Sequence, residues 1–215
     1  MCSLFLRGDL VQDLIQEIAK FSDDRVWRTK KTRMESEARL KQNHRRSNYL
    51  INYYTFAVLA FSIWSLIFEP ESTVAKYFTL MTIITSLGLF VLTLTISTLG
   101  FKEKALQFKE CYLRLDALEY DFKHLIRCAD ELDKETVKKR FYLLQKKYNE
   151  ILTLTDNHEQ SDSEKIIIDR KIAGYEQIEK KYNTRKKIIF YSVLLLFLIP
   201  ILLATILVII MKSSV

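Results

Sequence analysis

The chain has little glycine, proline, cysteine or histidine, and each scarcity excludes a class of protein. Its 215 residues include four Gly, two Pro, three Cys and three His. The phosphate-binding patterns GxxxxGK and GxGxxG are absent, as are the catalytic patterns HExxH and GxSxG. The cysteines form no CxxC pair, so neither a metal site nor a disulfide framework is expected. We therefore expect no catalytic residue, no cofactor and no metal, and we expect that the protein is not an enzyme.

Long runs without any Asp, Glu, Lys, Arg or His are the main positive feature of the sequence. They cover 49–68, 77–100 and 188–211. A helix needs about 20 apolar residues to cross the hydrocarbon core of a bilayer, and each run meets that length. All of the charged residues lie outside these runs, in segments too discontinuous for one conventional core. The sequence predicts an all-α membrane protein with three transmembrane helices and long amphipathic helices outside the membrane.

Positive charge is distributed so that it predicts the topology. Residues 1–48 carry 11 Lys and Arg and residues 101–187 carry 20, whereas the loop 69–76 carries one. Segments rich in Lys and Arg stay on the cytoplasmic side. We expect the N-terminus inside and the C-terminus outside. The predicted regions are cytoplasmic basic helices at 1–48, a transmembrane hairpin at 49–100, a cytoplasmic coiled-coil region at 101–187, and a last transmembrane helix with a short outer tail at 188–215.

The N-terminal region predicts two helices, separated by a break and helix cap at Ser22-Asp23-Asp24. The second of these is dense in Lys and Arg from Arg25 to Arg46. Such a helix next to a membrane is typical of attraction to anionic headgroups. The other interpretation is a basic face that binds an acidic ligand, such as a nucleotide signal. Nothing beyond charge favours nucleic acid, and none is expected as a partner.

Apolar residues in the cytoplasmic region alternate at spacings of three and four, which is typical of a coiled-coil seam. Asp133-Lys134-Glu135 interrupts the pattern and predicts an antiparallel hairpin, whose two halves pack on each other or on another subunit. The first half is expected to continue from the second span as one helix. A third helix, with a capping box at Ser161-x-x-Glu164, is expected to run directly into the third span. The seam residues are Phe108, Leu115, Leu118, Phe122, Leu125 and Leu132, followed by Phe141, Leu144, Tyr148 and Ile151.

The second span differs from the others by its many hydroxyl side chains. At about 100° per residue, five of them share one side of the helix. Two interpretations stay open, close packing against another helix and a weakly polar pore lining in an oligomer. In the third span, Pro200 predicts either a tolerated bend or a hinge. Four tyrosines near the span ends are expected at the membrane interface, namely Tyr49, Tyr53, Tyr54 and Tyr77. The five hydroxyl residues, named here the hydroxyl stripe, are Thr79, Thr82, Ser86, Thr93 and Ser97.

The order of these features resembles a known family. A basic helix that contains Arg39-Leu40 leads into a two-span hairpin, which ends at Gly100-Phe101-Lys102. A long helical region follows, with Tyr148-Asn149-Glu150-Ile151-Leu152 and then Asn157-His158. This arrangement is similar to the SLATT family, the SMODS- and SLOG-associating two-transmembrane effectors of bacterial defence systems. The run at 188–211 departs from a plain two-span layout and resembles subgroups with a C-terminal membrane segment.

The resemblance implies a membrane effector of abortive-infection-type antiviral defence in the bacterial inner membrane. Such a protein is expected to stay silent until an associated sensor or a nucleotide second messenger triggers it, and then to oligomerise and permeabilise the membrane. Membrane lipids and further copies of the chain are the other expected partners. Two alternatives come from other classes, a membrane-anchored coiled-coil scaffold and an ion channel subunit. No carboxylate ring or other selectivity element in the runs favours the channel.

Overall fold

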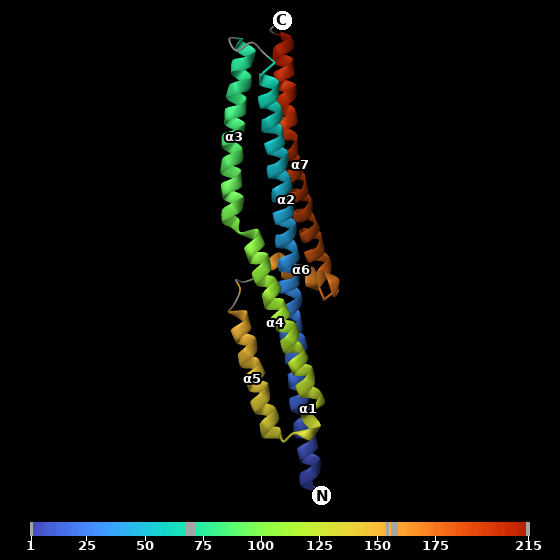
Figure 1. Ribbon diagram of the computed structural model, residues 1–215. Helices are drawn as coiled ribbons and strands as arrows, with labels where there is room; N and C mark the ends of the chain where they lie inside the picture. The colour runs from blue at the N-terminus through green and yellow to red at the C-terminus, as the bar shows by residue number, and fades with distance from the viewer. Residues whose placement is uncertain (1, 68–71, 154, 156–158, 214–215) are drawn as a thin grey trace. The chain divides into compact units, whose positions relative to one another are not determined.

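The computed structural model describes residues 2–67, 72–153, 155 and 159–213, without the side chains of 2–11, 74, 207, 208 and 210–213 (Figure 1). Every regular element in these ranges is a helix, which confirms the all-α prediction. The chain divides into two compact units. The core unit contains Met1–Leu40 and Glu103–Ile178, and the apolar unit contains Lys41–Lys102 and Glu179–Val215. The helices are α1 (Cys2–Phe21), a π-helix (Ser22–Trp27), α2 (Arg28–Ser65), α3 (Thr73–Leu99), α4 (Phe101–Arg127), a short 3₁₀ helix (Ala129–Glu131), α5 (Lys134–Leu152), α6 (Gln160–Asp169) and α7 (Tyr175–Ser213).

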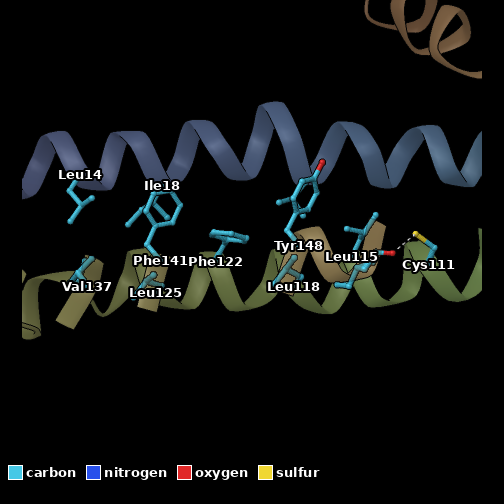
Figure 2. Close-up of a cluster of buried hydrophobic side chains, with 13 residues drawn as sticks. Leu14, Ile18, Cys111, Leu115, Leu118, Phe122, Leu125, Val137, Phe141 and Tyr148 are labelled. Carbon is cyan, nitrogen blue, oxygen red and sulfur yellow. Dashed lines mark hydrogen bonds between the residues drawn. The ribbon is translucent and has the colours of Figure 1, made fainter. Parts of the chain in front are cut away.

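The core unit is built around apolar side chains from α1, α4 and α5. The α4 and α5 residues are spaced by three and four, so each helix buries one continuous face. Figure 2 shows Leu14 and Ile18 of α1 pointing toward α4. Phe21 adds ring contacts to Phe122 at 5.6 Å and to Tyr148 at 5.5 Å between centroids. Burying each large apolar side chain contributes roughly 1.5–3 kcal/mol. The packing of α1 on α4 and α5 therefore stabilises the hairpin.

The break expected at Ser22-Asp23-Asp24 does not occur, and that prediction was wrong. Phe21 is helical, with φ −61° and ψ −44°, and the chain continues as a π-helix from Ser22 to Trp27. Leu14, Ile18, Ser22 and Val26 are buried at intervals of four residues. On an α-helix that interval drifts about 40° at each step. The wider π-turn reduces the drift, and so keeps Val26 on the buried face.

The expectation of one uninterrupted helix from the second span into the coiled coil is corrected by Gly100. This residue is the C-cap of α3 and has φ 57° and ψ 38°, in the left-handed region. Glycine occupies that region without the penalty that a Cβ brings. Phe101 then begins α4 directly. The backbone therefore has a defined joint at Gly100, between the apolar helix and the charged one.

The third cytoplasmic helix also ends earlier than expected. α6 stops at Asp169, and Gly174 has φ 83° just before α7 begins at Tyr175. The N-cap of α6 is Glu159, without a side-chain capping bond, so the predicted capping box at Ser161 is not formed. Asn157 and His158, which carry part of the family resemblance, lie outside the described residues.

The end of α6 is closed by a Schellman motif. The Ile172 N–H donates to the Ile167 carbonyl at 3.1 Å, and the Lys171 N–H donates to the Ile168 carbonyl at 3.1 Å. Lys171 takes the left-handed position of this motif, with φ 49°. Glycine usually occupies it, because an L side chain is strained there.

Replacing Lys171 with glycine is expected to stabilise the chain by about 0.5–1 kcal/mol, because the left-handed strain of a side chain is removed. The measurement is thermal unfolding of the full chain in a mild detergent, followed by circular dichroism. Lys171→Ala is the control, because it removes the charge and keeps the strain. An equal gain from both variants would attribute the effect to charge.

The apolar unit packs through a small cluster in which α2, α3 and α7 meet. Ala57 and Phe61 of α2 bury Phe78 of α3, and Trp64, Leu203 and Ala204 pack against them. The three helices lie side by side in this unit (Figure 1). Ser72 caps α3 by accepting a hydrogen bond from the Ala75 N–H at 3.1 Å. Most of the remaining apolar side chains in the unit are exposed.

Two stretches in the described residues are long and apolar enough to cross a membrane. One begins at Ala75 and includes α3, and the other begins at Tyr175 and includes most of α7. Almost none of either apolar window is buried. The uncharged part of α2 is not one of these two candidate stretches. It carries Asn52, Tyr53, Tyr54 and several hydroxyl residues, which lower its hydrophobicity.

Candidate functional site

The most unusual surface of the molecule is the apolar one on α2, α3 and α7. Phe56 is 71% exposed, Leu87 63% and Leu195 63%. Many neighbours on the same helices are also more than half exposed. Soluble monomers rarely expose contiguous apolar patches larger than a few hundred Å². These faces therefore require lipid or another protein surface as their surroundings.

The hydroxyl stripe lies mostly on the exposed side of α3. Thr79, Ser86, Thr93 and Ser97 are exposed, and Thr82 is half-buried. Packing within the chain therefore engages little of the stripe.

The hydroxyls of Thr79, Thr82, Ser86 and Thr93 donate hydrogen bonds to carbonyls of their own helix. Thr79 donates to the Ala75 carbonyl at 2.9 Å, and Thr93 donates to the Leu89 carbonyl at 2.8 Å. Each of these hydroxyl oxygens keeps lone pairs that accept further hydrogen bonds, while its proton is already used. The surface is weakly polar, and it is compatible with either lipid or a neighbouring helix.

Tyr53 and Tyr54 connect α2 to the backbone of α7. The Tyr53 hydroxyl donates to the Phe197 carbonyl at 2.9 Å, and the Tyr54 hydroxyl donates to the Leu196 carbonyl at 2.9 Å. The rings of Tyr53 and Phe197 lie 5.0 Å apart. These tyrosines therefore also connect two helices, while their position at the membrane interface stays a prediction. Beside them lies an apolar groove of about 630 Å³, lined by Phe56, Ala60, Pro200 and Ala204 among others.

The seam residues predicted from spacing lie within one chain, in the core unit. Nine of the ten are in the buried cluster or pack against it, and most are nearly inaccessible. Phe108 is also buried but lies outside the cluster, where the Arg33 guanidinium stacks 5.1 Å from its ring centre. The residues in the cluster or against it are Leu115, Leu118, Phe122, Leu125, Leu132, Phe141, Leu144, Tyr148 and Ile151.

Glu119 is the centre of a charged cluster beside this core. Its buried carboxylate binds the Lys123 ammonium at 2.6 Å and also the Lys30 ammonium of α2. Lys30 reaches Asp116 as well, at 2.9 Å. Burial alone raises the pKa of Glu119, but the hydrogen bonds from Lys123 and Lys30 outweigh it, so the pKa is lowered. Burial lowers the pKa of Lys30, and the bonds to Glu119 and Asp116 reverse this, so the pKa is raised.

These pKa shifts predict the pH range in which the cluster stabilises the chain. A lowered pKa for Glu119 means that its contribution is present above the unfolded-state pKa of about 4.3 and is lost as the pH falls through the folded value. The raised pKa of Lys30 means that its contribution is lost only as the pH rises above about 10.4. Both contributions are therefore complete near neutral pH.

Glu119→Gln is expected to lower the free energy of unfolding at pH 7 by about 2 kcal/mol, because two ammonium groups lose their buried partner. The loss relative to the unsubstituted chain should shrink between pH 5 and pH 3. Chemical denaturation of the full chain in detergent at several pH values measures both effects. Glu110→Gln is the matched control, since Glu110 pairs with Arg114 on the exposed side of the same helix. A pH-independent deficit for Glu119→Gln would contradict the pKa assignment.

A second charged cluster holds α6 against α2. The Arg39 guanidinium donates to both oxygens of Asp162, at 2.9 and 3.1 Å, and to Glu159 at 2.7 Å. Ser36 donates to the same Asp162 carboxylate at 2.8 Å. The Asp162 side chain is 3% exposed. Burial lowers the pKa of Arg39, and the bonds to Asp162 and Glu159 raise it beyond that loss.

These contacts change the interpretation of the basic helix. Lys30, Arg33 and Arg39 turn inward and meet acidic or aromatic groups of the core unit. Arg25, Arg28, Lys41 and Arg45 stay exposed. The sequence therefore suggested a larger exposed basic face than the structure has. The spacing of the basic residues did not reveal that acidic side chains of α4 and α6 pair with some of them. Among the described residues, no group of three or more His, Cys, Asp or Glu is placed to hold a metal ion.

A family model described as SMODS and SLOG-associating 2TM effector domain family 5 matches residues 15–212. Comparisons with curated proteins and with solved structures found no significant match. The family match includes all three uncharged runs, so the C-terminal apolar helix lies inside the family pattern. Two candidate membrane helices and a two-transmembrane family together point to a membrane location. Because the match covers nearly the whole chain, the protein belongs to SMODS and SLOG-associating 2TM effector domain family 5.

Proposed function

We propose that the protein is a non-enzymatic effector of bacterial antiviral defence that permeabilises the inner membrane when it is triggered. The trigger is an associated sensor protein or a nucleotide second messenger. The observation that carries the proposal is the contrast between the two units. The core unit buries its apolar residues within one chain, whereas the apolar unit exposes most of its own.

Three helices cross the membrane in this proposal. The segment of α2 from Tyr49 onward joins α3 and α7 as a third span. Its Tyr53, Ala57 and Phe61 contact α7 or α3, whereas its apolar Phe56, Leu59 and Ile63 are exposed. Arg45 and Arg46 precede it, and Lys186 and Lys187 precede the uncharged part of α7. Positive flanks at these positions favour a cytoplasmic N-terminus and an outer C-terminus.

Several copies form the conducting state. The seam residues already pack inside one chain, so contacts between copies in the membrane fall on the exposed faces of α3 and α7. The hydroxyl stripe then becomes a weakly polar lining that tolerates water. A change in the core unit reaches the membrane through covalent connections, the continuous helix α2 and the joint at Gly100.

The test is induced expression of the full chain in a bacterial host, with membrane potential and propidium entry followed over time. In a host that also carries the associated sensor, and under its triggering condition, the expected result is loss of potential and dye entry, and without the trigger neither is expected. The triple variant Thr82→Leu, Ser86→Leu and Thr93→Leu should slow dye entry roughly tenfold, because the lining loses its polar groups. Thr95→Leu is the control, since Thr95 is exposed about 170° away around the same helix.

Unchanged potential, with the protein in the membrane fraction and its trigger present, would contradict permeabilisation. That outcome would favour a membrane-anchored scaffold, in which the core unit recruits a cytoplasmic partner. Constant, ion-selective conductance without any trigger would instead favour a channel subunit. Equal effects of the triple variant and Thr95→Leu would remove the stripe from the lining.

A further inference from the structure

Pro200 leaves a defined defect in the backbone of α7. Proline has no N–H, so the carbonyl four residues earlier, that of Leu196, loses its partner within the helix. The proline ring also crowds the preceding turn, which contains Phe197. Pro200 is itself buried against α2. The helix therefore presents the Leu196 carbonyl oxygen without its backbone donor, next to the Phe197 carbonyl of the same turn.

Two consecutive tyrosines of α2 donate hydrogen bonds to the carbonyls of this turn. Tyr54 donates to the carbonyl of Leu196, and Tyr53 donates to the adjacent carbonyl of Phe197, both at 2.9 Å. The ring contact between Tyr53 and Phe197 fixes the approach of the two helices. The hydroxyls thus meet the very turn that Pro200 deprives of a backbone donor.

The setting makes this contact more important than it would be in water. In the hydrocarbon core no solvent donor is available, so an unsatisfied carbonyl must find a side chain from a neighbouring helix. Among the described residues that line the groove at the bend, Phe56, Ala60 and Ile201 have no side-chain donors. The Thr205 hydroxyl also lines the groove, but it donates to the Leu202 carbonyl at 2.8 Å. Separation of α7 from α2 would therefore expose polar backbone inside the membrane, where it attracts water.

We propose that Tyr53 and Tyr54 form a polar latch that holds α7 on α2 across the Pro200 bend and keeps the protein closed. Release of the latch frees α7 to move at the bend and opens a hydrated path beside the Leu196 and Phe197 carbonyls. This inference rests on the proposed function, since it assigns the resting state of the same membrane effector. The hydroxyls act by positioning α7, and they carry out no chemistry.

The test is a mutant cycle in the full chain, reconstituted in vesicles of phosphatidylethanolamine and phosphatidylglycerol with entrapped carboxyfluorescein. Tyr53→Phe with Tyr54→Phe keeps both rings and removes both donors. It is expected to raise spontaneous dye release roughly tenfold, as two hydrogen bonds are lost. In a Pro200→Ala background the same pair should have little effect, because alanine at this position restores the N–H donor to Leu196. Tyr49→Phe, at an exposed position of α2, is the matched control.

A second readout follows the helices directly. Cysteines at positions 57 and 204, in a background without the native cysteines, report contact between α2 and α7 by the rate of disulfide cross-linking, since Ala57 and Ala204 share one packed cluster. The tyrosine pair should slow this cross-linking several-fold with Pro200 present and leave it unchanged in the Pro200→Ala background.

Unchanged cross-linking in the tyrosine variant would overturn the latch, and so would an equal change in the Pro200→Ala background. The cross-linking cycle also separates the latch from the proposed function. The expected cross-linking pattern with no dye release from any variant would support the tyrosine contact that holds α7 on α2, and it would contradict both the hydrated path and the proposed permeabilisation.

Discussion

Phe122→Ala should lower the free energy of unfolding of the core unit by about 4 kcal/mol, the largest effect expected from a single substitution in this chain. Phe122 is 0% exposed and lies in the cluster between α1, α4 and α5. Its ring contacts Phe21 at 5.6 Å and Phe141 at 6.2 Å between centroids. Alanine would leave a cavity among three helices, and none of them can close it without losing contacts to the others.

Fluorescence measures this loss within the full chain. The chain has two tryptophans, Trp27 in the core unit and Trp64 in the apolar unit. A Trp64→Phe background therefore makes denaturation in detergent report on the core unit through Trp27. Tyr120→Ala is the control, because Tyr120 is 63% exposed on the same helix, and its cost should be within about 0.5 kcal/mol. Similar losses for both variants would contradict the three-helix core.

Asp162→Asn should lower the free energy of unfolding by about 3 kcal/mol, because it leaves the Arg39 guanidinium without its buried counterion. Asparagine keeps the size of the side chain, so the loss reports on charge and hydrogen bonding. Detachment of α6 from α2 should also be visible as faster hydrogen exchange of the α6 amides.

Glu159→Gln is the matched control for this substitution. Glu159 also binds Arg39, at 2.7 Å, but its side chain is 65% exposed. An exposed ion pair contributes about 0–1 kcal/mol. An effect of Glu159→Gln equal to that of Asp162→Asn would mean that burial of the carboxylate is not what makes the α2–α6 contact strong.

The helices and their buried faces could be predicted because they depend on local spacing. Intervals of three and four from Leu115 to Leu125 require one apolar side on any helix that contains them. The apolar runs could be assigned to a membrane from their composition alone, since they contain no charged residue over about 20 positions. Spacing does not name the partner of a face, however. The packing of Leu14 and Ile18 on α4 and α5, for example, was not predicted.

Helix ends were predicted less well, because local signals compete with burial. Ser22-Asp23-Asp24 has the composition of a cap, yet burial of Ser22 and Val26 keeps the chain helical. Gly100 and Gly174 both take positive φ, Gly100 at the end of α3 and Gly174 just before α7, and each lies where a continuous helix had been expected. Glycine beside a charged segment is a stronger sign of a helix terminus than the apolar pattern alone suggested.

The site was predictable in composition but not in its contacts. The hydroxyl stripe followed from about 100° per residue, while its role stays a prediction. The bonds from Tyr53 and Tyr54 to α7 could not be predicted, because residues more than 140 positions apart meet there. The absence of a backbone donor at Pro200 was the one signal that pointed to an external partner.

The proposed function requires that α2, α3 and α7 each cross the membrane, so that the two ends of the chain lie on opposite sides. Alkaline phosphatase is active only outside the inner membrane, and it tests this claim when fused either ahead of Met1 or after Val215 in the full chain. Three spans predict high phosphatase activity for the fusion after Val215 and almost none for the fusion ahead of Met1, at equal protein levels. Equal activities at both ends would mean an even number of spans and would contradict this prediction.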